Sequence, residues 1–302
     1  MHNLAPVFPS HGGILHQAED EISAIGAVVG SYFGGVPAVT ATSGPGLSLK
    51  QEFIGLSTVS ETPCIIINVQ RGGPSTGLPT RTEQSDLFAA TFGSHGDNTK
   101  VVFAVSTPED CFYAPHVARY LTEKLRCPVI VMSDYITSVS YKVFEAPKLA
   151  KLESIDEIDD AILNRFGLSK ITEDIPMVKS NQADPGSPEQ MRRITGLNTN
   201  DDGLVVYTPD SNKRSHDIRN EKIHCVRRAL QVPPRIGPDE GDLLVLGWGS
   251  SEGAIQEAVK HCQEKGLKVS GLNLTFVNPL PLQLKALFQK FKQVVTVEVA
   301  YG

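Results

Sequence analysis

Cys64-Ile-Ile-Ile-Asn-Val-Gln-Arg-Gly-Gly-Pro-Ser-Thr-Gly-Leu-Pro-Thr80 is the stretch that most strongly predicts the fold. It begins with apolar β-formers, which are typical of a buried strand, and then becomes rich in glycine and proline. The pattern predicts a strand followed by a loop that carries one cation, Arg71, and hydroxyl groups on Ser75, Thr76 and Thr80. Such donors at the carboxyl end of a strand are how an open α/β sheet holds a small anion. The alternative is a plain surface turn, but the number of donors around one arginine favours a binding site.

Strands and helices alternate along the first 140 residues. Runs of apolar and β-branched residues predict strands over residues 36–42, 64–69, 100–105 and 128–132. Helices are expected over residues 19–33, 43–60, 83–92 and 108–125. Helical stretches between strands predict a parallel, doubly wound α/β sheet, which binds ligands at the carboxyl ends of its strands.

Charge divides the chain into three parts. Residues 1–140 hold 19 charged side chains, residues 141–240 hold 32 and residues 241–302 hold 11. We therefore predict a first domain over 1–140, a charged connecting region over 141–240, and a smaller α/β domain over 241–302. The connecting region is expected to hold helices near 156–166 and 220–230. The last domain is expected to hold strands over 243–247, 268–272 and 294–297, with helices over 252–265 and 282–291.

Composition excludes several classes of protein. The net charge of −6 argues against a nucleic-acid partner, and no apolar run is long enough to span a membrane. The five cysteines occur singly, without a Cys-x-x-Cys pair, so this chain is expected to hold neither zinc nor an iron–sulfur cluster. Unpaired cysteines fit a reducing cytoplasm. A Gly-Asp-Gly…Asn segment, which would hold Mg²⁺ and a diphosphate, is also missing.

Three further segments are candidates for chemistry. Ser43-Gly-Pro-Gly46 follows a strand and opens a helix, so its N–H groups suit an anion, although a plain N-cap is an equal alternative. Glu21 begins a helix that continues with apolar and small residues. It either interacts with the helix dipole or enters a packed face, where it can share a proton with a ligand nitrogen. His95-Gly-Asp97 offers too few ligands for a metal, so we interpret it as a loop anchor.

Four segments together resemble the α subunit of 2-oxoacid:ferredoxin oxidoreductases, particularly the 2-oxoglutarate type. They are Gln17–Gly26, Thr40–Leu49, Gln70–Thr80 and Ser94–Asp97, and they occur in the family's order. The resemblance runs from about His11 to Asp134 and resumes over residues 195–198 and 241–302. It implies a pyrimidine-binding domain of the thiamine diphosphate fold, followed by a smaller domain of the transketolase C-terminal type.

The resemblance also implies an activity and its residues. The family converts a 2-oxoacid and coenzyme A to an acyl-CoA and CO₂ while reducing ferredoxin. Glu21 matches the glutamate that hydrogen-bonds the aminopyrimidine of thiamine diphosphate, and Arg71 matches the arginine that pairs with the 2-oxoacid carboxylate. Thr76 and Thr80 would shape the substrate pocket, with Ser43 and Gly44 lining it from the neighbouring strand. The β subunit of the family supplies the Mg²⁺ and diphosphate site and a [4Fe–4S] cluster.

The chain departs from the family at its start. Family members carry a Tyr-Pro-Ile-Thr-Pro motif upstream of the glutamate, and this chain has none. We therefore expect an α subunit that lacks the first strand and helix of its pyrimidine-binding domain and whose last domain is also incomplete. Two alternatives are a non-catalytic chain that only assembles with a β-like subunit, and a stand-alone binder of small carboxylates through the Arg71 loop.

Overall fold

Two sheets organise the computed structural model, which describes residues 4–147, 154–179, 187 and 194–301. The larger sheet has the strand order β1-β2-β4-β3-β7, and its first four members are parallel. The strands are β1 (Val39–Thr42), β2 (Cys64–Gln70), β3 (Val101–Ala104), β4 (Pro128–Asp134) and β7 (Phe276–Asn278). Strand β4 lies at the centre and is buried along its whole length. The predicted α/β class with a parallel sheet is confirmed.

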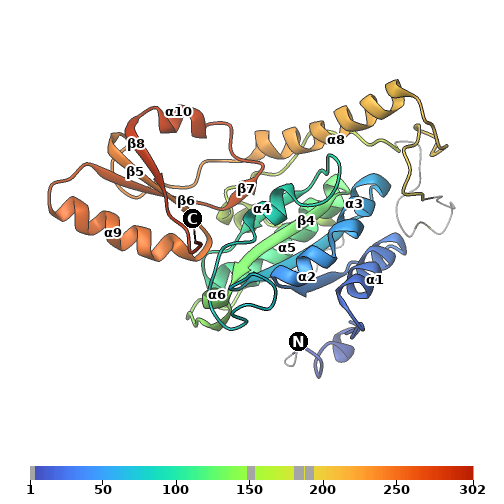
Figure 1. Cartoon of the computed structure of the whole chain (residues 1–302), viewed down its shortest axis with the longest axis horizontal. Helices are drawn as coiled ribbons and strands as arrows, with labels where there is room; N and C mark the ends of the chain where they lie inside the picture. The colour runs from blue at the N-terminus through green and yellow to red at the C-terminus, as the bar shows by residue number, and fades with distance from the viewer. Residues whose placement is uncertain (1–3, 148–153, 180–186, 188–193, 302) are drawn as a thin grey trace.

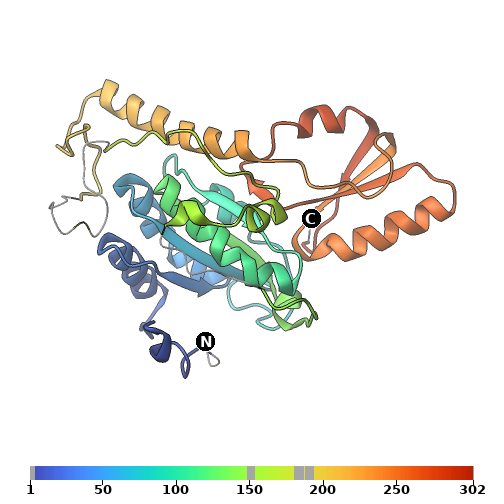
Figure 2. The ribbon, with the colours of Figure 1, turned by 180° about the vertical axis from the view of Figure 1, so that it is seen from behind.

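Helices cover both faces of this sheet. Helices α1 to α4 lie on the side facing the viewer in Figure 1, and α5 covers the side seen in Figure 2. Their bounds are α1 (Glu21–Phe33), α2 (Gly44–Leu49), α3 (Gln51–Ser60), α4 (Leu87–Phe92) and α5 (Pro108–Leu125), followed by the short α6 (Tyr135–Val139). The bounds of α5 agree with the prediction because Thr107 and Asp110 form a reciprocal capping box at its start.

The helix predicted over 43–60 is two helices, because the chain turns at Lys50 between α2 and α3. Lys50 is buried, and its Nζ donates a hydrogen bond of 2.8 Å to the backbone oxygen of Glu21. The first strand begins at Val39 rather than at Val36. The reason is that Val36 still closes the turn after α1, where its N–H donates to the Ser31 oxygen at 2.9 Å.

The connecting region contributes a long helix that lies along the first unit (Figure 1). It holds η2 (Ile155–Glu157), α7 (Asp160–Arg165) and α8 (Pro209–Ala229). Helix α8 begins at Pro209 instead of the predicted Asn220, because Thr208 caps its N-terminus by accepting a hydrogen bond from Ser211 N. The first turns of α8 are densely charged, so their sequence shows no clear apolar periodicity.

The last unit is built on the smaller sheet, with the parallel order β6-β5-β8. Its elements are β5 (Gly241–Trp248), η3 (Gly249–Ser251), α9 (Glu252–Glu264), β6 (Val269–Leu274), α10 (Leu284–Phe288) and β8 (Phe291–Thr296). Strand β7 belongs to this part of the sequence but pairs antiparallel with β3 of the larger sheet. Its three residues gave no sequence signal, because its pairing depends on a strand more than 170 residues earlier.

Hydrogen bonds join the last unit to the carboxyl edge of the larger sheet. Asn273 Nδ2 donates to Ser106 Oγ at 2.9 Å, and Ser250 Oγ donates to Asp134 at the end of β4. The two sheets therefore meet beside the strand ends at which a ligand site was predicted. Among the helices in the described part of the chain, none combines the length and the apolar character needed to cross a bilayer.

Candidate functional site

Glu21 and the Ser43–Gly46 segment meet at the end of β1. A Cβ atom placed on Gly46 would lie 2.8 Å from Cγ of Glu21 and would also clash with the hydroxyl of Thr42. Only glycine fits this position. The Glu21 side chain is half-buried, and no hydrogen bond or ion pair joins its carboxylate to another described residue. The carboxylate is therefore free to interact with a ligand.

A buried lysine stands behind this glutamate. Burial lowers the pKa of Lys50, and the negative charge of Glu21 opposes that shift. The Lys50 ammonium donates to the backbone oxygen of Glu21, so it fixes the first turn of α1 while leaving the carboxylate unoccupied. The start of α1 is also fixed by Asp20, which accepts a hydrogen bond of 2.7 Å from Ser23 N. Both contacts fix the position of Glu21, and neither involves its carboxylate.

Ser43 precedes α2 as its N-cap residue, and Gly44, the first residue of α2, lies against Asp86. A Cβ atom on Gly44 would lie 3.3 Å from a carboxylate oxygen of Asp86. Burial raises the pKa of Asp86, and hydrogen bonds from the Asn68 side chain and the Gly44 N–H oppose the rise. The Asn68 bond, from Nδ2 to Oδ2, is 2.9 Å long. Sequence analysis missed Asp86 because it stands in a polar stretch without a recognisable motif.

Arg71 is the first residue after β2 and is half-buried. Its Nε atom is buried and has no hydrogen-bond partner in the described part of the chain. Its positive charge also opposes the rise in the pKa of Asp86, so the two side chains share one electrostatic environment. A buried guanidinium N–H without a partner is costly, and a ligand carboxylate would satisfy it in the bidentate geometry that arginine favours.

The loop after Arg71 is folded onto itself. Gly72 N donates to the Arg81 oxygen at 3.0 Å, and Leu78 N donates to the Gly72 oxygen at 2.9 Å. Gly77 has a φ of +35°, and a Cβ atom there would lie 2.8 Å from the Gly73 backbone. These contacts place the loop's hydroxyl groups, on Ser75, Thr76 and Thr80, in exposed positions. The predicted substrate contacts of Thr76 and Thr80 stay predictions.

The end of this loop is clamped by the last unit through the buried Gln84. The Gln84 side chain accepts from Val299 N at 2.8 Å and donates to the Trp248 oxygen at 2.9 Å. Its backbone N–H also donates to the Val299 oxygen. The position of the Arg71 loop therefore depends on the smaller sheet, which the sequence did not indicate.

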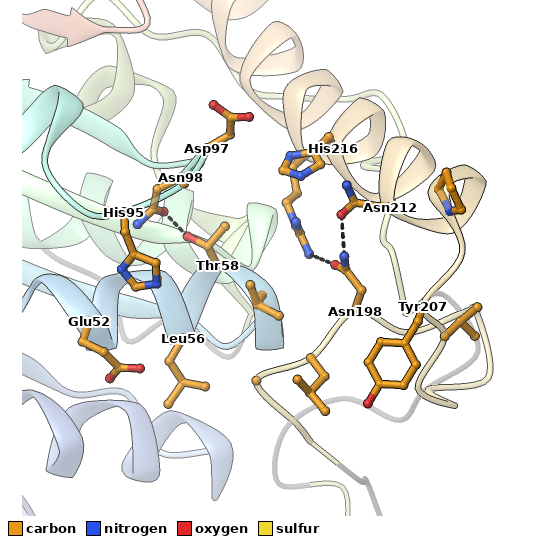
Figure 3. A pocket seen from close by; sticks show the side chains of 18 of the residues that line it. Glu52, Leu56, Thr58, His95, Asp97, Asn98, Asn198, Tyr207, Asn212 and His216 are labelled. Atoms are coloured by element: carbon orange, nitrogen blue, oxygen red, sulfur yellow. Dashed lines mark hydrogen bonds between the residues drawn. The ribbon is translucent and has the colours of Figure 1, made fainter.

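His95 and Asp97 lie away from this edge. They precede β3, whereas Arg71 follows β2, so in a parallel sheet the two segments lie toward opposite ends. His95 and Asp97 line a separate cavity of about 730 Å³ (Figure 3). No cluster of three or more potential metal ligands occurs among the described residues.

Comparison with known proteins gives consistent matches. Residues 1–195 match the family model described as pyruvate flavodoxin/ferredoxin oxidoreductase, thiamine diphosphate-binding. The 2-oxoglutarate oxidoreductase subunit KorA of Mycobacterium tuberculosis is 36% identical over 291 residues, covering 96% of this chain and 44% of that protein. The 2-oxoglutarate synthase subunit KorA of Methanocaldococcus jannaschii is 35% identical, with 99% of this chain and 79% of that protein covered.

A solved structure is also similar. It is a 2-oxoglutarate:ferredoxin oxidoreductase from Magnetococcus marinus with 2-oxoglutarate, coenzyme A and succinyl-CoA bound. It superposes with a TM-score of 0.86 at 36% identity, covering 99% of this chain and 52% of the solved chain. The present chain thus spans about half the length of that chain and of the Mycobacterium relative. The predicted thiamine diphosphate fold is confirmed.

Proposed function

Because the chain belongs to the pyruvate flavodoxin/ferredoxin oxidoreductase family through the thiamine diphosphate-binding domain, we propose that it is the α subunit of a 2-oxoacid:ferredoxin oxidoreductase. We propose 2-oxoglutarate as its substrate, since the names of the relatives described above include that compound. The reaction would join the acyl group to coenzyme A, release CO₂ and pass the electrons to ferredoxin. The five unpaired cysteines fit a cytoplasmic location.

The observation that carries the proposal is a pair of charged groups at one edge of the sheet that have no partners among the described residues. They are the Glu21 carboxylate, packed on Gly46, and the Arg71 guanidinium, whose Nε is buried and unpaired. Unsatisfied groups of opposite sign suit a cofactor nitrogen and a substrate carboxylate respectively. Structural charges are normally paired, so both groups favour a ligand site.

The described residues fit thiamine diphosphate as a shared cofactor. When bound, it supplies a nucleophilic carbon and accepts the electrons released by decarboxylation. Glu21 would hold a proton at a nitrogen of its aminopyrimidine ring. Arg71 would bind the 2-oxoacid carboxylate through its planar fork, with Ser43, Gly44, Thr76 and Thr80 around it. Asp86 would position Arg71 and the Gly44 turn.

A β subunit would complete the site. The chain shows no Gly-Asp-Gly…Asn segment for Mg²⁺ and the diphosphate, and its described residues form no metal cluster. We therefore propose that Mg²⁺ and a [4Fe–4S] cluster reside in that partner, which would also pass electrons to ferredoxin. Neither the whole activity nor cofactor binding is expected from this chain alone.

Co-purification with the partner chain tests the proposal. The complex is assayed with 2-oxoglutarate, pyruvate and 2-oxoisovalerate, in the presence of coenzyme A and ferredoxin. We expect succinyl-CoA formation and ferredoxin reduction with 2-oxoglutarate, both dependent on added thiamine diphosphate. A stable complex without turnover on any 2-oxoacid would favour the non-catalytic alternative. Tight binding of a 2-oxoacid to the isolated chain without cofactor would favour the stand-alone binder.

A further inference from the structure

A cavity lies between the first unit and helix α8 (Figure 3). Its volume of about 730 Å³ falls within the range of small-molecule pockets. One wall is α3 with the His95–Asn98 segment, and the other is α8 with residues 196–198 and 206–209. The cavity faces away from the Arg71 edge, so it does not belong to the site described above.

The wall formed by α8 is polar. Asn212, His216 and Arg219 line the cavity, and their spacing of i, i+4 and i+7 places them on one face of the helix. Figure 3 shows His216 on the α8 wall and His95 and Asn98 on the opposite wall, while Asn212 accepts a hydrogen bond of 2.5 Å from Asn198 Nδ2. A helix that packs on a domain normally turns an apolar stripe inward. A polar stripe beside a cavity favours ligand binding over packing.

Arg219 is the central observation. It is 4% exposed, and its Nε atom is buried without a hydrogen-bond partner in the described chain. Its Nη2 donates a long bond of 3.3 Å to the neutral Asn198 amide. Burial lowers the pKa of Arg219, and the charge of Glu61 opposes that shift. Glu61, however, already accepts hydrogen bonds from Lys222 Nζ and from the N–H groups of residues 178 and 179. A buried guanidinium without its own anion is costly.

A second donor lines the same cavity. Asn98 accepts from the Thr58 hydroxyl through Oδ1, and its Nδ2 atom is buried without a partner in the described chain. Arg219 and Asn98 therefore offer unsatisfied donors from opposite walls. Glu52 and Asp97 also line the cavity. These two carboxylates would repel a polyanion and would accept hydrogen bonds from hydroxyl or amino groups.

We propose that this cavity binds a small organic anion with one phosphate or carboxylate group, held by Arg219 and Asn98, and with hydroxyl or amino groups that face Glu52 and Asp97. Nucleoside monophosphates, sugar phosphates and amino acids share this chemistry. The inference stands apart from the proposed function, because no residue of the Glu21 and Arg71 site takes part.

Calorimetric titration of the full chain tests the site. The probes are AMP, glucose 6-phosphate and glutamate, with inorganic phosphate and succinate as anions that lack the additional donors. We expect at least one of the first three to bind with a Kd below about 1 mM, and tenfold or more tighter than both plain anions. Arg219→Met should weaken that binding at least tenfold. Lys213→Met is the matched control, since Lys213 lies on the same helix, 76% exposed and outside the cavity.

A cavity-filling variant tests the location without removing a charge. Gly55 lines the cavity within α3, and a Cβ atom placed there would meet only Asn98 Nδ2, at 3.9 Å. Gly55→Leu should therefore abolish binding without changing the temperature at which the chain unfolds. Gly30→Leu is the control, because Gly30 is a helical glycine of α1 with no atom within 4 Å of its added Cβ.

Three results would overturn the proposal. They are the lack of binding of every organic probe at millimolar concentration, equal binding of inorganic phosphate or succinate, and unchanged binding in Gly55→Leu. Should Arg219→Met fail to fold, the Gly55→Leu and Gly30→Leu pair still decides the location. These outcomes are distinct from a failure of the proposed function, since the titration requires neither the partner chain nor thiamine diphosphate.

Discussion

Charged side chains at the two ends of the larger sheet differ in whether they have partners within the chain. At the carboxyl end, the Glu21 carboxylate and the Arg71 Nε atom have no partner among the described residues. At the amino end, Glu61 is fully buried, and its carboxylate accepts hydrogen bonds from Lys222 Nζ at 2.6 Å and from Val178 and Lys179 N–H groups at 2.9 Å. The Glu61 charge is therefore satisfied within the chain, whereas the two groups that we propose to bind ligands have no partner among the described residues.

Arg219 breaks this division. It lies near the Glu61 and Lys222 pair but has an unsatisfied Nε atom, as Arg71 does at the other end. The proposed ligand of the α8 cavity would supply the anion that Arg219 lacks among the described residues. The variants below test whether the satisfied charges contribute to stability and the unsatisfied ones to activity.

Glu21→Gln should produce the largest effect. The amide keeps the shape of the side chain but cannot share its proton with a cofactor nitrogen in the same way, so we expect turnover of the assembled complex to fall by about 10³-fold or more. Stability should fall only slightly, because the carboxylate makes no hydrogen bond or ion pair with a described residue and only its charge acts on the buried Lys50. Steady-state kinetics and thermal unfolding are measured together, with the exposed neighbour Glu19→Gln as control. Normal turnover would remove Glu21 from the cofactor site.

Lys222→Met should act on stability instead. It leaves the Glu61 carboxylate buried without its counter-ion, and breaking such a pair typically costs about 3–5 kcal/mol. Denaturant unfolding of the chain measures the loss, and Lys213→Met on the exposed side of α8 should cost less than about 0.5 kcal/mol. The double variant Glu61→Gln/Lys222→Met should recover part of the loss, because the buried carboxylate that Lys222→Met leaves without its lysine is then neutral as well. A double variant less stable than Lys222→Met would contradict the charge argument.

Arg71→Ala should lower kcat/KM for the 2-oxoacid by about 10²-fold, because a charge-assisted pair with the substrate carboxylate is lost. The loss should arise from the weaker interaction with the substrate carboxylate, and the affinity for thiamine diphosphate should not change. Arg81→Ala is the control, since Arg81 is an exposed arginine at the other end of the same loop. Equal kinetics for Arg71→Ala and Arg81→Ala would exclude the substrate role.

Sequence analysis recovered the parts of this molecule that depend on local signals. The apolar run Cys64–Gln70 and the capped start of α5 were found because each carries its signal within a few residues. Glu21 and Arg71 were predicted from contiguous motifs and a family resemblance, and their roles stay predictions. The structure adds that Gly46 must lack a side chain because Glu21 and Thr42 occupy that space.

Long-range features escaped the sequence for a physical reason. Gln84 contacts Trp248 and Val299 across more than 160 residues, and strand β7 exists only through its pairing with β3. The polar inward face of α8 was hidden because its side chains look like those of a solvated helix until α3 is placed against them. Such features depend on which segments meet, and no single window of sequence contains both partners.

Lys100 gives the smallest predicted effect and a pH test of the comparison. It is buried at the amino end of β3, and its Nζ donates to the Gly93 carbonyl oxygen at 2.6 Å, with no described carboxylate in reach. Burial lowers its pKa from 10.5 to about 8. Between these values the unfolded chain binds one proton more than the folded chain, so stability should rise as the pH rises from about 8 to 10.5 and stay level below about 8.

The Lys100→Met variant should lack this rise. The shift corresponds to at most about 3 kcal/mol, and we expect about 2 kcal/mol because the carbonyl hydrogen bond offsets part of the burial cost. Denaturant unfolding at several pH values measures the difference between Lys100→Met and the unaltered chain, with the exposed Lys290→Met as control. Unlike Lys222, which has Glu61 as counter-ion, Lys100 is buried with a charge that destabilises the folded chain. Deprotonation at high pH removes this penalty. A difference that does not change across this pH window would mean that the Lys100 charge is compensated as well as that of Lys222.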